Sequence, residues 1–196
     1  MAAKTAVTVR LEEITGIDTV AGMWCTLEPC CTISFFQSWG WIGAWLKSLP
    51  AATRPHLIVA ETDGELSGLA ILTPAKVRRH RLLTSEALFL NETGLAGYDF
   101  VIEHNGFLLR PGREQQTLDA CLHFLATEVD GWDEIFISGI RQDSPLFLSE
   151  ALAGHDIQRR VLRTSSSRYV NLEELRRSGR VYLDTLSSNT RYQVRR

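Results

Sequence analysis

"HLIVAETDGELSGLAILTPA" (residues 56–75) places two aliphatic runs on either side of the dipeptide Asp63-Gly64. Asp-Gly is a preferred pair for the two-residue turn of a β-hairpin, because both turn positions require positive φ. The flanking runs, residues 56–62 and 65–75, are rich in residues that favour strands. The stretch therefore predicts two adjacent antiparallel strands.

One strand and two helices are expected before this hairpin. Residues 7–14 alternate as an edge strand does, and residues 16–29 are typical of a helix. In residues 38–50 (SWGWIGAWLKSLP) apolar side chains recur every three or four positions, Ser38 can cap a helix and Pro50 follows its end.

Several further elements are expected after the hairpin. Strand propensity continues through "KVRRHRLL" and "EALFLNETG". The remaining pattern predicts a strand at 100–103 extending to Leu109, a helix at 113–129, a strand in "WDEIFISGI", a helix at 144–153, strands at 156–163 and 167–172, and helices at 173–187 and 189–196. Hairpins combined with one strand–helix–strand unit predict an α/β (α+β) fold, with a mixed, largely antiparallel sheet flanked by helices.

The composition is that of an ordinary soluble domain. The chain has 196 residues, 44% hydrophobic and 22% charged, enough for one large core. No apolar run approaches a membrane span, and the N-terminus lacks the apolar region of a secretory signal. The four cysteines (Cys25, Cys30, Cys31 and Cys121) lack paired CxxC spacing, so we expect reduced thiols in a cytoplasmic protein and no metal site.

The net charge of −2 conceals an asymmetry between the two ends of the chain. Residues 156–196 contain ten arginines and four acidic residues, a net of +6, which leaves −8 for residues 1–155. The basic end suits either solvated helix faces or a phosphate-bearing partner. Nucleic acid is disfavoured as that partner, because only Tyr169, Tyr182 and Tyr192 interleave with the arginines.

The strand–turn–helix pattern at residues 107–125 is the best candidate for an anion site. A helix N-terminus presents free amides and a partial positive charge to a phosphate. Arg110 and Arg113 would add charge-assisted hydrogen bonds, and Gly112 would let the backbone come close. The turn has a single glycine, however, and the carboxylate of Glu114 would compete with a phosphate for the partial positive charge at the helix N-terminus. An ordinary helix start is the alternative.

Two polar triplets end apolar strands, Asn91-Glu92-Thr93 and Glu103-His104-Asn105. If these strands are neighbours, the acidic residues or His104 converge and can act as a general base for an amine. Strand alternation would place Glu103 and Asn105 on one side and His104 on the other. The alternative is that the triplets are turn residues with local hydrogen bonds. A Ser/His/Asp triad has no nucleophile-elbow pattern to support it.

The succession of several blocks resembles a known family. "FFQSWGWIGAWL", "LIVAETDGELSGLAILTPAKV", "LNETG…YDFVIEHNGFLLRPGRE", "WDEIFISGI" and "YLDTLSSNTRYQVRR" together resemble the GNAT-type acyltransferases associated with cellulose or exopolysaccharide biosynthesis. In that family the last block bridges two tandem GNAT-like halves. We therefore expect residues 1–172 to form a GNAT-like domain and residues 173–196 a helical bridge toward a second GNAT-like domain.

The resemblance implies a GNAT-like acyl-CoA N-acyltransferase fold and an activity. The donor would be acetyl-CoA or another acyl-CoA, and the small-molecule acceptor an amine on a sugar or similar compound, in polysaccharide biosynthesis. The alternative is a non-catalytic first half that packs on a following catalytic GNAT domain and shapes its acceptor site. Tandem GNAT-like peptidyltransferases that use aminoacyl-tRNA are a second relative, but their long helical arm is not visible in the sequence.

The same resemblance assigns provisional roles to the candidate residues. Glu103 or His104 would be the catalytic base, and Asn91, Glu92 and Asn105 would orient the acceptor. Arg110, Gly112 and Arg113 would lie nearest the donor phosphates. GNAT proteins carry R/Q-x-x-G-x-G/A at this turn, whereas "RPGREQ" keeps the leading arginine and lacks the glycine pair.

Overall fold

The computed structural model describes residues 6–79, 83–95, 97, 102–166 and 169–195. It divides into two compact units, Met1–Ile157 and Gln158–Arg196. This boundary lies nearer the N-terminus than the one expected from the sequence, between residues 172 and 173. None of the helices in the described part of the chain is long and apolar enough to cross a membrane.

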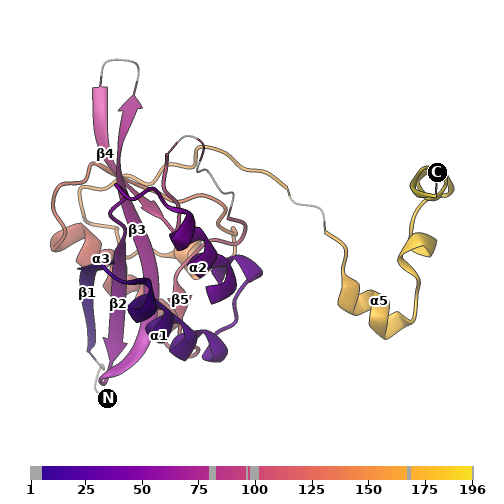
Figure 1. Cartoon of the computed structure of the whole chain (residues 1–196), viewed down its shortest axis with the longest axis horizontal. Coiled ribbons are helices and arrows are strands. Elements are labelled where there is room, and N and C mark those ends of the chain that lie inside the picture. The colour runs from indigo at the N-terminus through magenta and orange to yellow at the C-terminus, as the bar shows by residue number, and fades with distance from the viewer. Residues whose placement is uncertain (1–5, 80–82, 96, 98–101, 167–168, 196) are drawn as a thin grey trace. The chain divides into compact units, whose positions relative to one another are not determined.

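A mixed sheet is the centre of the first unit (Figure 1). Its strands are β1 (Val7–Glu13), β2 (His56–Thr62), β3 (Glu65–Arg79), β4 (Leu83–Leu90), β5 (Leu108–Leu109) and β6 (Glu134–Phe136). The order is β1-β2-β3-β4-β6, and β5 pairs with β3. Among the strand pairings of the described residues, β4 and β6 are parallel and the others are antiparallel. The predicted α/β class with a largely antiparallel sheet is therefore confirmed.

The predicted hairpin is formed by β2 and β3. Thr62 pairs with Glu65 across the turn, and Asp63 and Gly64 have φ of 56° and 77°. Positive φ at both central residues is the signature of the type I′ turn that matches the twist of paired strands. The local prediction from Asp63-Gly64 was right.

Helices cover both faces of the sheet and bury alternate residues of its central strands. Helices α1 (Ile17–Leu27) and α2 (Trp39–Ser48) cover one face, with the 3₁₀ turns η1 (Glu28–Cys30) and η2 (Phe35–Gln37) between them. Helices α3 (Glu114–Thr127) and α4 (Pro145–Leu148) belong to the other face. Leu57 and Val59 of β2 pack toward α1 and α2, whereas Ile58 and Ala60 pack toward α3.

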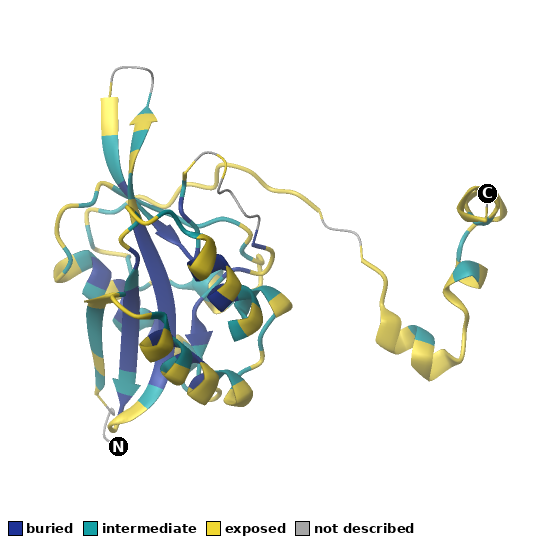
Figure 2. Cartoon of the chain, viewed as in Figure 1, coloured by how far each residue is buried: buried dark blue, intermediate teal, exposed yellow. Residues whose placement is uncertain are grey.

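The burial of the sheet follows from this two-sided cover (Figure 2). The middle of β2 and β3 is buried on both faces, and the hairpin of β3 and β4 becomes more exposed beyond Thr73. Helix α3 comes close to the sheet at Gly68, where an added Cβ would lie 2.7 Å from Thr117 Cγ2. Glycine at this position therefore lets α3 approach β3.

Strands β4 and β5 share one edge of β3. Leu72 to Arg79 pair with β4, and Gly68 and Leu69 pair with β5. The chain thus leaves this edge after Leu90 and returns to it at Leu108. We call the intervening segment, residues 91–107, the edge excursion. It contains both polar triplets singled out in the sequence.

The predicted strand at 100–109 was wrong for most of its described residues. Residues 100 and 101 lie outside the described part of the chain. Glu103 and His104 form a turn, with φ of 59° at His104, and only Leu108 and Leu109 are paired. Strand alternation therefore does not decide where the Glu103 and His104 side chains point.

The second unit holds three short elements, α5 (Leu172–Ser178), η3 (Tyr182–Thr185) and α6 (Ser188–Val194). The strand predicted at 156–163 is absent, and residues 169–171 of the predicted strand at 167–172 are irregular; residues 167 and 168 lie outside the described part. A strand needs a neighbouring edge for its backbone hydrogen bonds. The structure pairs neither described segment with a strand.

Candidate functional site

The carboxyl ends of β4 and β6 meet at one corner of the sheet because the two strands run parallel. Ala87 to Phe89 pair with Glu134 to Phe136, so the residues that follow both strands lie close together. Ser138 Oγ donates a hydrogen bond to Glu92 Oε1 across this corner. Glu92, from the first predicted triplet, is therefore linked to a residue that the sequence analysis did not single out.

Asn91 and Asn105 bring the two triplets together inside the protein. Asn91 Nδ2 donates to Asn105 Oδ1 at 2.8 Å and to Gly106 O at 2.9 Å, while Asn91 Oδ1 accepts from Ile71 N at 3.0 Å. Asn105 Nδ2 donates to Leu90 O at 2.9 Å. Both side chains are buried. Their amides thus satisfy backbone groups where the chain leaves the edge of β3.

A close contact with Gly139 fixes the other side of the edge excursion. Asn105 N donates to Gly139 O at 3.1 Å. Gly139 has φ of 63°, and a Cβ added there would lie 1.8 Å from Ile102 O. No other residue type fits this position without moving one of the two segments.

The turn at Glu103 and His104 is exposed, and so are Arg141 and Asp143. Asp143 lies near enough for the charge of His104 to affect it. The pKa of Asp143 is lowered chiefly by its hydrogen bonds from Arg141, and the charge of His104 adds to the effect. Arg141 Nε donates to Asp143 Oδ1 at 2.8 Å.

Sequence reasoning missed Ser138, Arg141 and Asp143 as members of this corner. The available signal was that they follow the apolar strand "EIF", as Asn91 follows "ALFL". Because the carboxyl ends of neighbouring parallel strands lie together, a parallel β4–β6 pairing would have predicted their approach.

The turn before α3 lies at the opposite end of β5 from this corner. Arg113 Nη1 donates to Asp63 Oδ2 at 3.2 Å, and Arg110 Nη1 lies 3.9 Å from Glu65 Oε2. Arg110 Nε also donates to Leu66 O at 2.8 Å. Both arginines thus face the tip of the β2–β3 hairpin. Surface ion pairs of this kind contribute little to stability.

The start of α3 is the turn at which the sequence predicts an anion site. Arg113 occupies the N-cap without a side-chain cap hydrogen bond, which leaves the first-turn amides uncapped by that residue. Gly112 has φ of 80°, and the space around a Cβ at this position is open. Glu114 lies in the first turn and opposes an anion there.

The outer edge of β5 lies between the corner and the turn. Arg110 N donates to Ser67 O at 2.8 Å, so antiparallel alternation turns the N–H and C=O of Leu109 away from β3. Among the hydrogen bonds of the described residues, none engages these two groups. They form a short strand edge that can pair with an extended ligand.

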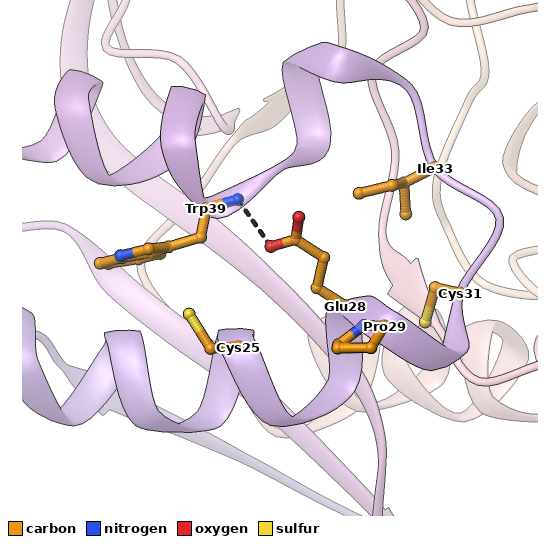
Figure 3. A pocket seen from close by; sticks show the side chains of 6 residues that line it. All are labelled: Cys25, Glu28, Pro29, Cys31, Ile33 and Trp39. Carbon is orange, nitrogen blue, oxygen red and sulfur yellow. Dashed lines mark hydrogen bonds between the residues drawn. The ribbon is translucent and has the colours of Figure 1, made fainter.

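A pocket of about 580 Å³ opens among α1, η1 and α2. Figure 3 shows Cys25 and Trp39 on one side, Cys31 and Ile33 on the other, and Glu28 between them. Glu28 Oε2 accepts from Trp39 N at 2.8 Å. Burial raises the pKa of Cys31 to about 11, and the charges of Arg110 and Glu114 also act on this thiol. The pocket therefore lies near the start of α3.

Comparisons with known proteins assign no family. No family model matches the sequence, and no curated protein matches it. Among solved structures, an aminoglycoside N-acetyltransferase in complex with CoA is similar over 85% of this chain and 98% of its own chain, with 14% identity and a TM-score of 0.39. A likeness of this size establishes neither common ancestry nor a shared activity.

Proposed function

We propose that this protein is an N-acyltransferase of the GNAT type, which transfers an acyl group from acyl-CoA to an amine. The observation that carries the proposal is the backbone of Leu109, whose N–H and C=O face away from β3. The exposed His104 precedes β5 in the chain, and the helix start flanked by Arg110 and Arg113 follows it. The pantetheine arm of CoA is extended and contains amides, so it can pair with such an edge. The resemblance of the sequence blocks to GNAT proteins points the same way.

The turn before α3 supplies the donor end of the site. The uncapped helix start and open space at Gly112 suit the pyrophosphate of CoA. Arg113, released from Asp63, would add a charge-assisted hydrogen bond to it. Arg110 would contribute mainly through its charge, because its Nε already holds Leu66 O.

The corner supplies the base. The acceptor nitrogen attacks the thioester carbonyl, so that a C–N bond forms and the C–S bond breaks. His104 accepts the proton that the amine loses, and the Asp143 carboxylate lies nearby. Glu103, beside it in the exposed turn, is the second candidate for the base. The sulfur leaves as the CoA thiol after it takes up a proton from solvent.

In this proposal, Asn91 and Asn105 contribute to the acceptor site by positioning the backbone. The amides of Asn91 and Asn105 are used inside the protein, so they would hold the turn of Glu103 and His104 in place. Glu92, linked to Ser138, borders the same corner. The acceptor we propose is an amine on a sugar or a similar small molecule, in keeping with a role in polysaccharide biosynthesis.

Acetyl-CoA binding and amine acetylation test the two halves of the site separately. Calorimetry should show acetyl-CoA binding that weakens in Arg113→Ala. Release of CoA thiol in the presence of amino sugars should fall about 10²- to 10⁴-fold in His104→Asn. Asparagine tolerates the positive φ of His104, so acetyl-CoA affinity should stay unchanged in that variant.

Arg54→Ala is the matched control for Arg113→Ala. Arg54 also pairs with a carboxylate at the surface, Glu13 at 3.7 Å, but lies away from the start of α3. Its replacement should leave acetyl-CoA binding as it is. Absence of heat and of any thermal shift at millimolar acetyl-CoA would refute donor binding by this chain.

We propose a non-catalytic half as the second candidate. The observation that favours it is the exposed apolar surface of the second unit. Nine large apolar residues are exposed there: Val161, Leu162, Tyr169, Val170, Leu172, Val181, Tyr182, Tyr192 and Val194. Apolar surface of this extent suits packing against another domain, and the unit would then attach the sheet to a following catalytic GNAT-like domain.

Limited proteolysis discriminates between the two candidates. The second unit should be cleaved quickly in this chain and become protected when a following GNAT-like domain is present. Protection of the second unit from proteolysis, without acetyl-CoA binding by the first unit, would favour the non-catalytic half. Binding of acetyl-CoA with unchanged cleavage would favour the acyltransferase.

A further inference from the structure

Two histidines lie side by side on the α3 side of the sheet, away from the site described above. His123 Nδ1, on α3, lies 3.3 Å from His155 Nε2. The ring centroids are 5.3 Å apart and the rings are inclined at 59°. The residues are separated by 32 positions in the sequence, so tertiary packing, rather than a local turn, brings them together.

The separation of the two nitrogens matches the geometry of tetrahedral zinc. With Zn–N bonds of about 2.0–2.1 Å and a tetrahedral angle, two coordinated nitrogens lie about 3.3–3.4 Å apart. The 90° angle of a square-planar or octahedral site would bring them nearer, to about 2.8–3.0 Å for bonds of similar length. We propose that His123 and His155 bind a zinc ion through these two nitrogens.

Contacts on both sides of the pair hold together the two segments that carry the histidines. Cys121, Leu122 and Leu125 of α3 are buried in the same core cluster that Leu146 and Leu152 pack against. One turn before His123, Asp119 Oδ1 accepts from Ser149 Oγ at 2.8 Å. The segment that carries His155 is therefore already fixed to α3, and binding needs little further ordering.

The site is open to solvent. His123 is exposed and His155 is half-buried. Among the described residues, no cluster of three or more His, Cys, Asp or Glu side chains is arranged to hold a metal. Water would then complete the coordination, and the ion would exchange more readily than in a four-ligand structural site. A bound ion would link α3 to the segment that ends the first unit at Ile157.

Zinc titration of the full chain tests this proposal, independently of any acyltransferase activity. Calorimetry should show one Zn²⁺ per chain, and zinc should raise the Tm of the first unit. His123→Gln and His155→Gln should each weaken binding at least about tenfold and abolish the rise in Tm. Co²⁺ in place of zinc should give the strong visible absorption of tetrahedral cobalt.

Two control variants separate this site from other zinc ligands. His56→Gln removes a histidine elsewhere, on β2, and should leave binding unchanged. Cys25→Ser/Cys30→Ser removes both exposed thiols and should also leave it unchanged. Failure to bind zinc at millimolar concentration would overturn the proposal, and so would binding that survives both histidine variants or is lost with the thiols. In that case the two rings form only a hydrogen-bonded pair.

Discussion

A hydrogen bond of 2.8 Å from Asn91 Nδ2 to Asn105 Oδ1 joins the beginning of the edge excursion to its end. Asn91 also accepts from Ile71 N, as a paired strand residue would. The side chain thus takes the place of a strand in the gap between β4 and β5. The same amides that the sequence suggested for ligand binding maintain the shape of the corner.

Replacement of Asn91 should strongly destabilise the first unit. Asn91→Gly keeps a residue suited to the positive φ of 52° but leaves Ile71 N, Gly106 O and Asn105 Oδ1 without this partner. We expect a loss of about 2–4 kcal/mol in the free energy of unfolding. Asn91→Ala should cost about 1 kcal/mol more, because alanine disfavours that φ. Tryptophan fluorescence in urea measures both, and equal stability of the two variants would contradict the role of backbone conformation.

Gly139→Ala should destabilise the protein by about 3 kcal/mol or more, because a Cβ would meet Ile102 O at 1.8 Å on a residue with φ of 63°. Gly131→Ala is the control, since Gly131 has φ of 81° but open space around a Cβ. It should cost only about 1–2 kcal/mol for the unfavourable φ. Similar losses in urea unfolding of the two variants would show that the Ile102 contact has no special effect.

The four cysteines should react with iodoacetamide in a fixed order. Cys25 and Cys30 are exposed and should be alkylated first at pH 8. Burial raises the pKa of Cys31 to about 11 and that of Cys121 to about 12. On the order of one Cys31 thiol in a thousand is then ionised, so it should react slowly. Cys121, fully buried, should react only after unfolding.

Peptide mass spectrometry measures this order, with protein unfolded in guanidinium as the reference in which all four thiols react. Alkylation of Cys121 in the folded protein at the rate of Cys30 would contradict the packing of α3 against the sheet.

The ion pair between Arg79 and Glu134 should make stability depend on pH. Arg79 Nε and Nη2 donate to the Glu134 carboxylate at 3.0 and 2.8 Å, which lowers the pKa of Glu134. The pair therefore stabilises the folded state above the pKa of an unfolded glutamate, about 4.3, and the stabilisation is lost as pH falls through the lower folded pKa.

Arg79→Met should reduce stability at pH 7 by less than about 1 kcal/mol, because both side chains are partly exposed. The difference from the unaltered protein should shrink as the pH is lowered below 4. Urea unfolding across this range measures it. Arg78→Met, which alters an exposed neighbour, should show no such pH dependence; a constant difference for Arg79→Met would argue against titration of Glu134.

Local signals predicted the parts of the fold that depend on nearby residues. Asp63-Gly64 determined the hairpin turn through backbone conformation, and Ser38 caps α2 as expected, accepting from Trp41 N. The strands predicted at 100–109 and 156–163 failed because a strand depends on a distant edge as well as on its own pattern. At Asn105, side-chain hydrogen bonds to Leu90 and the contact with Gly139 replace the expected ladder.

The site was only partly accessible to the same reasoning. Convergence of Glu92 with Glu103 or His104, which the sequence suggested, stays a prediction. The contact that the structure shows between the two triplets joins Asn91 and Asn105, and nothing local in the sequence shows that these amides point inward. The contributions of Ser138 and Asp143 depend on the parallel register of β4 and β6. His123 and His155 become neighbours only when the segment after β6 folds back over α3.

Because residues 91–107 depart from and rejoin the same side of β3, the pairing on either side of the departure is set independently. Residues can be inserted or deleted between the two polar triplets while β4, β5 and α3 keep their alignment, because Asn91 and Asn105 join the two ends of the stretch. The length of this one segment can thus vary while the buried contacts at both of its ends are kept.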